Sequence, residues 1–341
     1  MSALAIALIL IVIVLVSAAL TAALRHYAVR RSLMDIPNAR SAHTIPTPRG
    51  GGLAIVICVL AIVPALAWAG LMEYRTCWAL LGAGGLIASI GFADDHGHIA
   101  VRWRLLTHFL AAAWVVLWLG GAPPFELAGL EIGSGWGSAL IAAIYLAWAV
   151  NLYNFMDGID GIAAVEAITV CLAAATLHAL VLTPSSAVLP LTVAAASAGF
   201  LYWNLPPAKI FLGDVGSGFL GVVLGTLSLQ AGWLDSRLLW AWLILLGVFV
   251  VDATFTLLHR LYRGEKLHQA HRSHAYQRAA RRVRRHLPVT LAVGAINLLW
   301  LFPIALLVGH DWLSGLTGLL LAYFPLVIVA QHLRAGASDE S

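Results

Sequence analysis

Eleven apolar stretches, each about as long as a membrane-spanning helix, run through the 341 residues of the chain. A helix needs about 20 apolar residues to cross the hydrocarbon core of a bilayer. The stretches use most of the chain, so no separate soluble domain fits. The sequence therefore predicts an all-α integral membrane protein of about 11 transmembrane helices, forming one domain over residues 1–341. The expected helices lie at about 3–24, 51–71, 77–93, 104–121, 136–154, 160–182, 186–203, 215–232, 238–261, 288–308 and 312–332.

The composition agrees with a surface that faces lipid. Hydrophobic residues make up 61% of the chain and charged residues only 11%, whereas a soluble domain has roughly 25% charged residues. Cys58, Cys77 and Cys171 lie in or beside the apolar stretches without the spacing of metal ligands. We interpret them as small packing residues. The first stretch has no basic segment before it and is too long for a signal peptide, so it is expected to remain a helix.

The basic residues predict the orientation in the membrane. The connections after the odd-numbered stretches, with the C-terminal tail, contain eighteen lysines and arginines, and the other connections contain only Arg75 and Arg237. Because cytoplasmic loops carry the excess of positive charge, the first set is expected in the cytoplasm. The N-terminus is then outside and the C-terminus in the cytoplasm.

The unusual polar segments all fall on the predicted cytoplasmic side, and the outer connections are short and plain by comparison. A transporter must bind its substrate from both sides and usually places its site near the midplane. One-sided chemistry instead favours an enzyme with its active site in the cytoplasmic loops. The polar segments read "DIPNARSAHTIPTPRGGG", "GFADDHGHIAVRWR", "NFMDGIDG", "NLPPAKIFLGDVGSG" and "KLHQAHRSHAYQR".

Five carboxylates in these segments point to a bound cation. Asp94 and Asp95 are adjacent, and Asp157 and Asp160 would share one helix face if the sixth helix starts there. Asp214 precedes a Gly/Ser-rich turn into the eighth helix, where free amides favour phosphate. A hard divalent cation such as Mg²⁺, with Mn²⁺ as an alternative, takes oxygen ligands and also binds substrate phosphates.

Simpler interpretations apply to several charged residues. The arginines of 278–285 fit the positive-inside rule and anionic lipid head groups better than catalysis. Asp252, inside the ninth stretch, is either part of the site or paired elsewhere, because a carboxylate in a membrane is costly. Glu166 is similar and could be a packing partner. The basic residues nearest the acidic segments are Arg49, Arg102, Arg104, Lys209 and those of the run 268–285.

The five segments, in this order on one membrane face, resemble the polyprenyl-phosphate N-acetylhexosamine-1-phosphate transferases of glycosyltransferase family 4. The likeness covers about 35–285, and its wording in "PTPRGGG" and "HRSHAYQR" is closest to the O-antigen-initiating branch. The resemblance implies transfer of N-acetylhexosamine-1-phosphate from a UDP-sugar to undecaprenyl phosphate, with release of UMP. It also implies a place in the bacterial inner membrane, with the N-terminus in the periplasm and the active site facing the cytoplasm. His268, His271 and His274 are spaced, whereas the muramyl-pentapeptide enzyme is expected to have a continuous triplet. That departure argues against a muramyl-pentapeptide substrate.

The resemblance also implies catalytic roles. Asp214 matches the metal ligand. Asp157 is expected to bind the same metal and to take part in catalysis. Asp94 and Asp95 match the pair assigned to catalysis, Asp94 as the proposed base. Two histidines, His271 and His274, match the motif expected near the diphosphate.

Substrate-binding positions follow in the same way. Asn154, Asp157 and Asp160 match the motif that lines the cleft, with Asp160 toward the uridine. Three further positions are expected to hold the nucleoside, with Phe211 stacking on it. Apart from the resemblance, two of the arginines near the acidic segments are expected to contact substrate. These five residues are Asn204, Phe211, Gly213, Arg49 and Arg104.

The chemistry of the acceptor adds a hypothesis of our own. A phosphate monoester has a second pKa of about 6, so the lipid phosphate is largely a dianion at neutral pH. Asp94 and Asp95 are then expected to place metal and substrate more than to remove a proton, although a covalent aspartyl intermediate stays open. The expected partners are the UDP-sugar, undecaprenyl phosphate and the bilayer, without nucleic acid and with a homodimer left open. Lipid I synthesis, a transporter that uses Glu166 and Asp252, and a non-catalytic scaffold are the alternatives.

Overall fold

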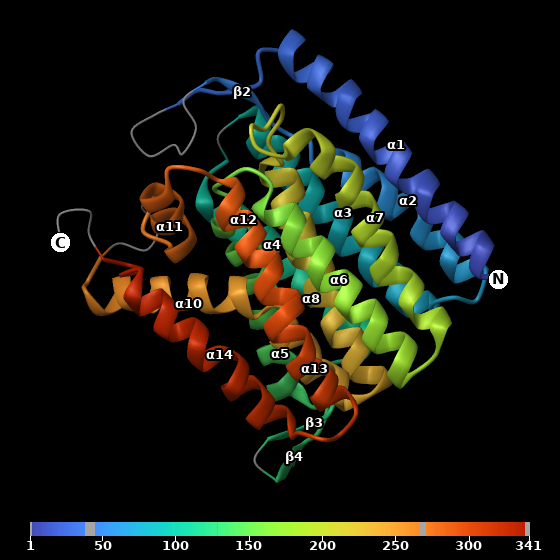
Figure 1. Ribbon diagram of the computed structural model, residues 1–341. Helices are drawn as coiled ribbons and strands as arrows, with labels where there is room; N and C mark the ends of the chain where they lie inside the picture. The colour runs from blue at the N-terminus through green and yellow to red at the C-terminus, as the bar shows by residue number, and fades with distance from the viewer. Residues whose placement is uncertain (1, 38–44, 98, 128, 266–270, 338–341) are drawn as a thin grey trace.

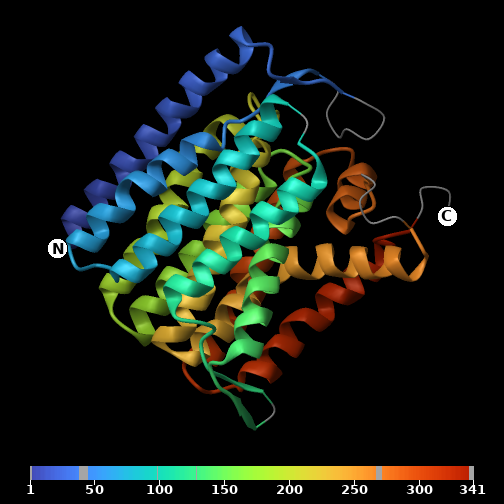
Figure 2. The same cartoon turned by 180° about the vertical axis from the view of Figure 1, so that it is seen from behind.

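The structure, a computed structural model, describes residues 2–37, 45–97, 99–127, 129–265 and 271–337. Most of its helices run side by side in one bundle (Figures 1 and 2). The helices are α1 (Ala3–Arg30), α2 (Leu53–Trp68), α3 (Tyr74–His96), α4 (Val101–Leu119), α5 (Trp136–Met156), α6 (Ile162–Val181), η1 (Pro184–Ala187), α7 (Val188–Asn204), α8 (Gly213–Leu234), α9 (Ser236–Leu245), α10 (Gly247–Tyr262), α11 (Ala275–Val283), α12 (Leu287–Ile296), η2 (Asn297–Leu301), α13 (Phe302–Gly309) and α14 (Gly315–His332).

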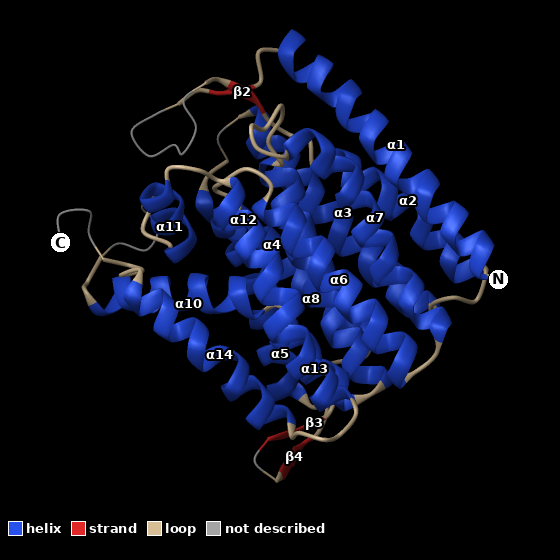
Figure 3. Cartoon of the chain, in the orientation of Figure 1, coloured by secondary structure: helices blue, strands red, loops and turns tan. Residues whose placement is uncertain are grey.

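Two short antiparallel ribbons are the strands of the described chain (Figure 3). β1 (Met34–Asp35) pairs with β2 (Thr47–Pro48), and β3 (Phe125–Leu127) pairs with β4 (Leu130–Ile132). The first ribbon lies at one end of the bundle and the second at the opposite end (Figure 1). Apart from these two short ribbons, the regular structure of the described residues is helical. The protein is therefore an all-α membrane protein, as predicted.

Each predicted apolar stretch coincides with a helix or a continuous helical run, except the ninth, which corresponds to the bent pair α9–α10. Among the described residues, eight helices are long and apolar enough to cross a membrane, or up to nine if the bent pair α9–α10 counts as one span. Helix α2 has only 16 residues. The positions of the apolar helices are confirmed, whereas the number of eleven spans and the orientation stay predictions.

Helix α8 runs through the centre of the bundle. It packs against α3, α5 and α9, and 94% of its most apolar 18-residue stretch is buried inside the protein. Glycines allow this close packing: a Cβ on Gly221 would lie 2.5 Å from the carbonyl oxygen of Ala149 in α5. The first turn of this central helix carries Asp214.

The ninth stretch, predicted as one helix, is broken between α9 and α10 by a bend of 67°. Tyr323 of α14 packs close to Gly247 at the break, and its hydroxyl donates to the carbonyl of Leu243 at 2.6 Å. A side chain that takes a helical carbonyl is a known cause of kinks. After the bend, α10 leaves the bundle and passes α14 toward α11 (Figure 1).

Two helix starts differ from the prediction. Helix α6 begins at Ile162, after Gly161 in the left-handed region (φ +77°), so Asp157 and Asp160 lie in the α5–α6 turn and do not share a helix face. Helix α8 begins at Gly213 and not after the Gly/Ser segment, so Asp214 stands inside its first turn.

Several interpretations of buried residues are resolved. Cys58, Cys77 and Cys171 are buried and free, as packing residues should be. Glu166 is buried, and its Oε2 accepts from the amide of Asn297 at 2.7 Å, so it pairs within the bundle.

Candidate active site

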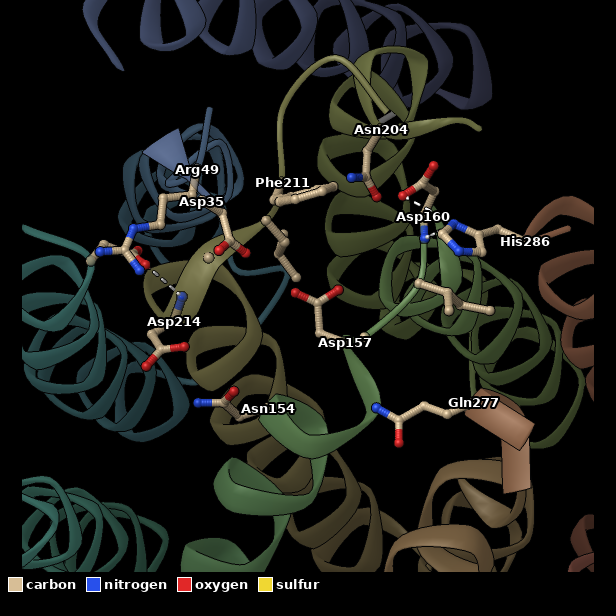
Figure 4. A pocket seen from close by; sticks show the side chains of 15 residues that line it. Asp35, Arg49, Asn154, Asp157, Asp160, Asn204, Phe211, Asp214, Gln277 and His286 are labelled. Atoms are coloured by element: carbon tan, nitrogen blue, oxygen red, sulfur yellow. Dashed lines mark hydrogen bonds and ion pairs between the residues drawn. The ribbon is translucent and has the colours of Figure 1, made fainter. Parts of the chain in front are cut away.

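A pocket of about 240 Å³ lies at the end of the bundle that carries the β1–β2 ribbon (Figures 1 and 4). All five polar segments of the sequence contribute to its wall. It is lined by Asp35, Arg49, Asp95, Asn154, Asp157, Gly158, Ile159, Asp160, Asn204, Phe211, Leu212, Gly213, Asp214, Gln277 and His286. Folding thus brings together segments that are far apart in the chain.

Most of the predicted site residues line this pocket, namely Arg49, Asp95, Asn154, Asp157, Asp160, Asn204, Phe211, Gly213 and Asp214. Asp94 and Arg104 line a smaller adjoining hollow, which shares Asn154 and Asp214 with the pocket. The two predicted histidines that the structure describes, His271 and His274, are not part of either wall, and His268 lies outside the described residues.

Asp95 holds the N-terminus of α8. Its Oδ1 accepts from the amide of Asp214 at 3.1 Å, and its Oδ2 accepts from the amide of Val215 at 3.2 Å. Gly213 makes room for the carboxylate, since a Cβ there would lie 2.6 Å from Oδ2. Asp95 therefore satisfies two of the free amides of a helix start and fixes where Asp214 stands.

Asp94 is engaged on both carboxylate oxygens. Its Oδ1 accepts from the amide of Ile99 at 2.7 Å, and its Oδ2 pairs with Arg104 Nη1 at 2.7 Å. The same guanidinium lies 3.4 Å from Asp214 Oδ2. Arg104 thus joins two of the acids and offsets part of their charge.

Negative charge accumulates around Asp157. Burial raises the pKa of this carboxyl well above its ordinary value, and the neighbouring Asp214, Asp95 and Asp160 raise it further. Like charges in a shared site push a carboxylate toward its neutral form unless a cation is present. A divalent cation between these acids would remove that cost.

The donor chemistry fits such a cation. Among the described residues, no three His, Cys, Asp or Glu side chains converge as a closed metal cage. Mg²⁺ does not need one, because it usually keeps several waters and takes one or two carboxylates together with substrate phosphates. Asp157 and Asp214 face the same pocket and could supply those carboxylates.

The other end of the pocket is built around Asp160. Its Oδ2 accepts from the amide of Ala208 at 3.1 Å, and its Oδ1 lies 3.2 Å from His286 Nδ1. The side-chain amide of Asn204 bridges the same turns, since Oδ1 accepts from Gly161 N and Nδ2 donates to the Ile210 carbonyl, each at 2.9 Å. Asn204, which is expected to hold the nucleoside, uses these polar atoms to position the wall.

Phe211 belongs to this end as well. Its backbone pairs with the glycine-rich segment after β2: its N–H donates to the Pro48 carbonyl at 2.8 Å, and its carbonyl accepts from Gly51 N at 2.9 Å. The aromatic side chain lies at the top of the pocket in Figure 4, between the acidic end and Asn204.

Within the histidine segment, His271 and His274 lie outside the pocket wall, and Asp252 organises this part of the segment. This carboxylate accepts from the amides of Ala275 and Tyr276 at 2.9 Å and lies 3.3 Å from His274 Nδ1. The hydroxyl of Tyr276 donates to the Phe155 carbonyl at 2.9 Å, just before the α5–α6 turn. Asp252 is therefore paired with the start of α11 and does not face the site.

His271 is neutral at ordinary pH. Burial, followed by the nearby His274 and Arg260, lowers its pKa to about 3. Its Nδ1 lies 3.0 Å from the hydroxyl of Ser273. An imidazole in this state and place can organise the loop, but it carries no charge to offer a diphosphate.

Three lining residues with polar side chains were not among the predicted site residues. Asp35 and Gln277 lie inside the quoted segments, and their polar side chains were the available signal. His286 follows the arginine run that we assigned to lipid head groups, and no motif marks it. All three point toward the cavity in Figure 4.

Comparison with known proteins identifies one matching family profile and several similar proteins. The profile of glycosyl transferase family 4 matches residues 77–232. A probable undecaprenyl-phosphate N-acetylglucosaminyl 1-phosphate transferase of Bacillus subtilis is 30% identical over 270 residues, which cover 76% of this chain and 73% of the relative. A decaprenyl-phosphate N-acetylglucosaminephosphotransferase of Mycolicibacterium smegmatis is 32% identical, covering 75% and 73%. A phospho-N-acetylmuramoyl-pentapeptide-transferase of Gluconobacter oxydans is 30% identical, covering 53% and 58%.

Proposed function

The chain belongs to glycosyl transferase family 4, and on that premise we propose that it transfers N-acetylhexosamine-1-phosphate from a UDP-sugar to undecaprenyl phosphate and releases UMP. It is an enzyme of the glycosyl-1-phosphate transferase class. The site would face the cytoplasm, where nucleotide sugars are made, and the product would be the first lipid-linked sugar of a surface polysaccharide of the O-antigen type.

One observation carries this proposal: a single pocket joins an acidic end with an end suited to a nucleoside. Asp157 and Asp214 line the acidic end, and Phe211 with Asp160 lines the other. A UDP-sugar has the same division, since its diphosphate needs a cation and its uridine is neutral. The surrounding apolar helices suit an acceptor whose phosphate is attached to a polyprenyl chain.

The reaction is a phosphoryl transfer. An oxygen of the lipid phosphate attacks the β-phosphorus of the UDP-sugar, the bond from that phosphorus to the bridging oxygen breaks, and UMP leaves with the electron pair. Positioning and charge neutralisation supply most of the catalysis in such reactions. Asp214 and Asp157 would hold Mg²⁺ or Mn²⁺, which when bound supplies positive charge next to the diphosphate.

The remaining acids act by positioning. Asp95 sets the first turn of α8 and therefore the place of Asp214. Asp94 is tied to Arg104 and to a backbone amide, so each of its oxygens is already engaged. The acceptor is largely a dianion at neutral pH and needs little help to lose a proton. We therefore assign proton removal to neither residue of the pair.

UMP release by the purified protein tests the proposal. The assay would use a panel of UDP-N-acetylhexosamines and undecaprenyl phosphate, with Mg²⁺ or with EDTA. We expect release that needs both metal and lipid phosphate, that falls at least about a hundredfold in Asp214→Asn, and that is unchanged in His310→Asn, at the far end of the bundle. If a folded preparation used only the muramyl-pentapeptide donor, lipid I synthesis would replace the proposal. If it used no donor, the transferase assignment would be wrong.

A further inference from the structure

We propose that His286 is a specificity-determining residue that donates a hydrogen bond from Nε2 to a carbonyl oxygen of the pyrimidine of the donor nucleotide. The inference rests on the proposed function and adds a contact to it. His286 lies immediately before α12, far along the chain from the acidic segments, and its ring lines the pocket at the end where Asp160 stands (Figure 4).

Two contacts fix His286 on the α5–α6 turn. The amide of Asp160 lies 3.3 Å from His286 Nδ1, and Asp160 Oδ1 lies 3.2 Å from the same nitrogen. One turn further along α12, the hydroxyl of Thr290 donates to the Asp160 carbonyl at 2.8 Å. The start of α12 is thus attached to the turn at two levels, and the ring is held at its Nδ1 edge.

The state of Nδ1 decides what Nε2 can do. The Asp160 N–H donates to Nδ1 at 3.3 Å, so Nδ1 accepts and the neutral ring carries its hydrogen on Nε2; a neutral ring with its hydrogen on Nδ1 would set that hydrogen against the Asp160 N–H. If the ring is protonated, Nδ1 donates to the Asp160 carboxylate and Nε2 again carries a hydrogen. Nε2 makes no hydrogen bond within the described residues 2–37, 45–97, 99–127, 129–265 and 271–337. The Nε2–H group is therefore a hydrogen-bond donor that has no acceptor in the pocket wall, on a ring whose position is fixed at Nδ1.

The chemistry of the pocket indicates which part of the donor this hydrogen meets. The diphosphate belongs with the cation at Asp157 and Asp214, so the nucleoside must extend toward Phe211 and Asp160. A uracil ring offers two carbonyl oxygens and one N–H group. A carbonyl oxygen accepts from the imidazole N–H, whereas a neighbouring carboxylate suits the N–H group of the base. His286 and Asp160 together match both kinds of group on one edge of uracil.

Binding of UMP and its sulfur analogues tests this contact directly. In 2-thio-UMP and 4-thio-UMP one carbonyl oxygen is replaced by sulfur, which accepts hydrogen bonds poorly. We expect one analogue to bind the wild-type protein about three- to tenfold more weakly than UMP, the value of one hydrogen bond. Calorimetry in detergent with Mg²⁺ present would give the dissociation constants.

Two substitutions separate the two nitrogens of the ring. His286→Gln keeps an N–H group near the position of Nε2, and His286→Asn keeps one only near Nδ1. We expect the glutamine variant to retain most of the preference for UMP over the thio analogue and the asparagine variant to lose it. His310→Asn is the matched histidine control, since His310 is exposed beside Trp312 at the far end of the bundle.

Steady-state kinetics provide an independent test of the contact. In His286→Asn we expect the KM for the UDP-sugar to rise about three- to tenfold while the KM for the lipid phosphate and kcat change little. A residue that only supported the fold would change both KM values or the melting temperature.

Other outcomes would overturn the inference. If both thio analogues bind wild-type protein as well as UMP does, or if the preference survives in His286→Asn, His286 does not contact a carbonyl of the base. If the wild-type protein turns over UDP-sugars normally in either case, the proposed function stands and only this contact is wrong. If the wild-type protein neither binds UMP nor releases UMP from any UDP-sugar, the proposed function and this inference fail together.

Discussion

Replacing Asp95 by asparagine should destabilise the fold, because this carboxylate serves two backbone amides at the start of α8. Asp95 is 4% exposed, and its two oxygens accept from the amides of Asp214 and Val215. Asparagine has one acceptor oxygen and would turn its NH₂ group toward the second amide. One of the two hydrogen bonds is therefore lost, and the favourable interaction of a negative charge with the helix start is lost with it.

The size of the effect follows from these contacts. A hydrogen bond to a charged group contributes about 1.5–3 kcal/mol, and asparagine regains part of this because burying it costs less than burying a charge. We expect a net loss of about 2 kcal/mol. With about 2.1 cal/mol/K per residue, the 341 residues have an unfolding entropy of roughly 0.7 kcal/mol/K, so the Tm should fall by about 3 °C.

The three buried cysteines provide the assay. They react with a thiol-specific fluorescent dye only when the bundle opens, so dye fluorescence on heating reports Tm. Asp235→Asn is the matched control: Asp235 caps α9 through Oδ1 alone, and its Oδ2 pairs with Arg237. Asparagine caps helices as well as aspartate, so this change should cost less than about 1 kcal/mol. An unchanged Tm in Asp95→Asn, or an equal fall in Asp235→Asn, would refute the capping argument.

Three further substitutions test the rest of the site. Asp94→Asn should lower UMP release by a factor that stays constant from about pH 7 to pH 9, because its carboxylate positions an arginine; recovery at high pH would instead identify a base. Gly213→Ala should lower Tm and UMP release more than Asp95→Asn does, because its φ of +77° and a Cβ 2.6 Å from Asp95 Oδ2 both oppose a side chain; a wild-type melting curve would contradict this. Asp252→Asn should speed hydrogen exchange in the first turn of α11, where the Ala275 or the Tyr276 amide loses its acceptor, and should lower both UMP release and Tm; unchanged exchange would show that Asp252 does not hold this turn.

The apolar pattern of the sequence was sufficient to locate the helices, because lipid requires a long apolar segment wherever the chain crosses. It could not locate the break between α9 and α10. That break depends on Tyr323, which reaches the Leu243 carbonyl from a helix 80 residues further along the chain. The start of α8 was misplaced for a similar reason, since its capping carboxylate, Asp95, lies 119 residues before Asp214.

The same limit applies to the site. The acids and glycines of the polar segments were visible as local patterns, and most of them do line the pocket. The sequence could not show that His271 and His274 lie outside the wall, because the position of this part of the segment is decided by Asp252 in another helix. His286 had no local signal at all, since what marks it is its contact with Asp160, 126 residues earlier.

The enclosure of α8 has a consequence for how the protein is made. The segments that cover its start and its glycine-lined faces, α2, α3 and α5, all precede it in the chain and therefore leave the ribosome first. When α8 enters the membrane, the surface that receives it already exists, together with the Asp95 carboxylate that accepts its first amides. The acidic end of the pocket is thus assembled in the order of synthesis, and the residues of α11 and α12 that close the opposite end arrive last.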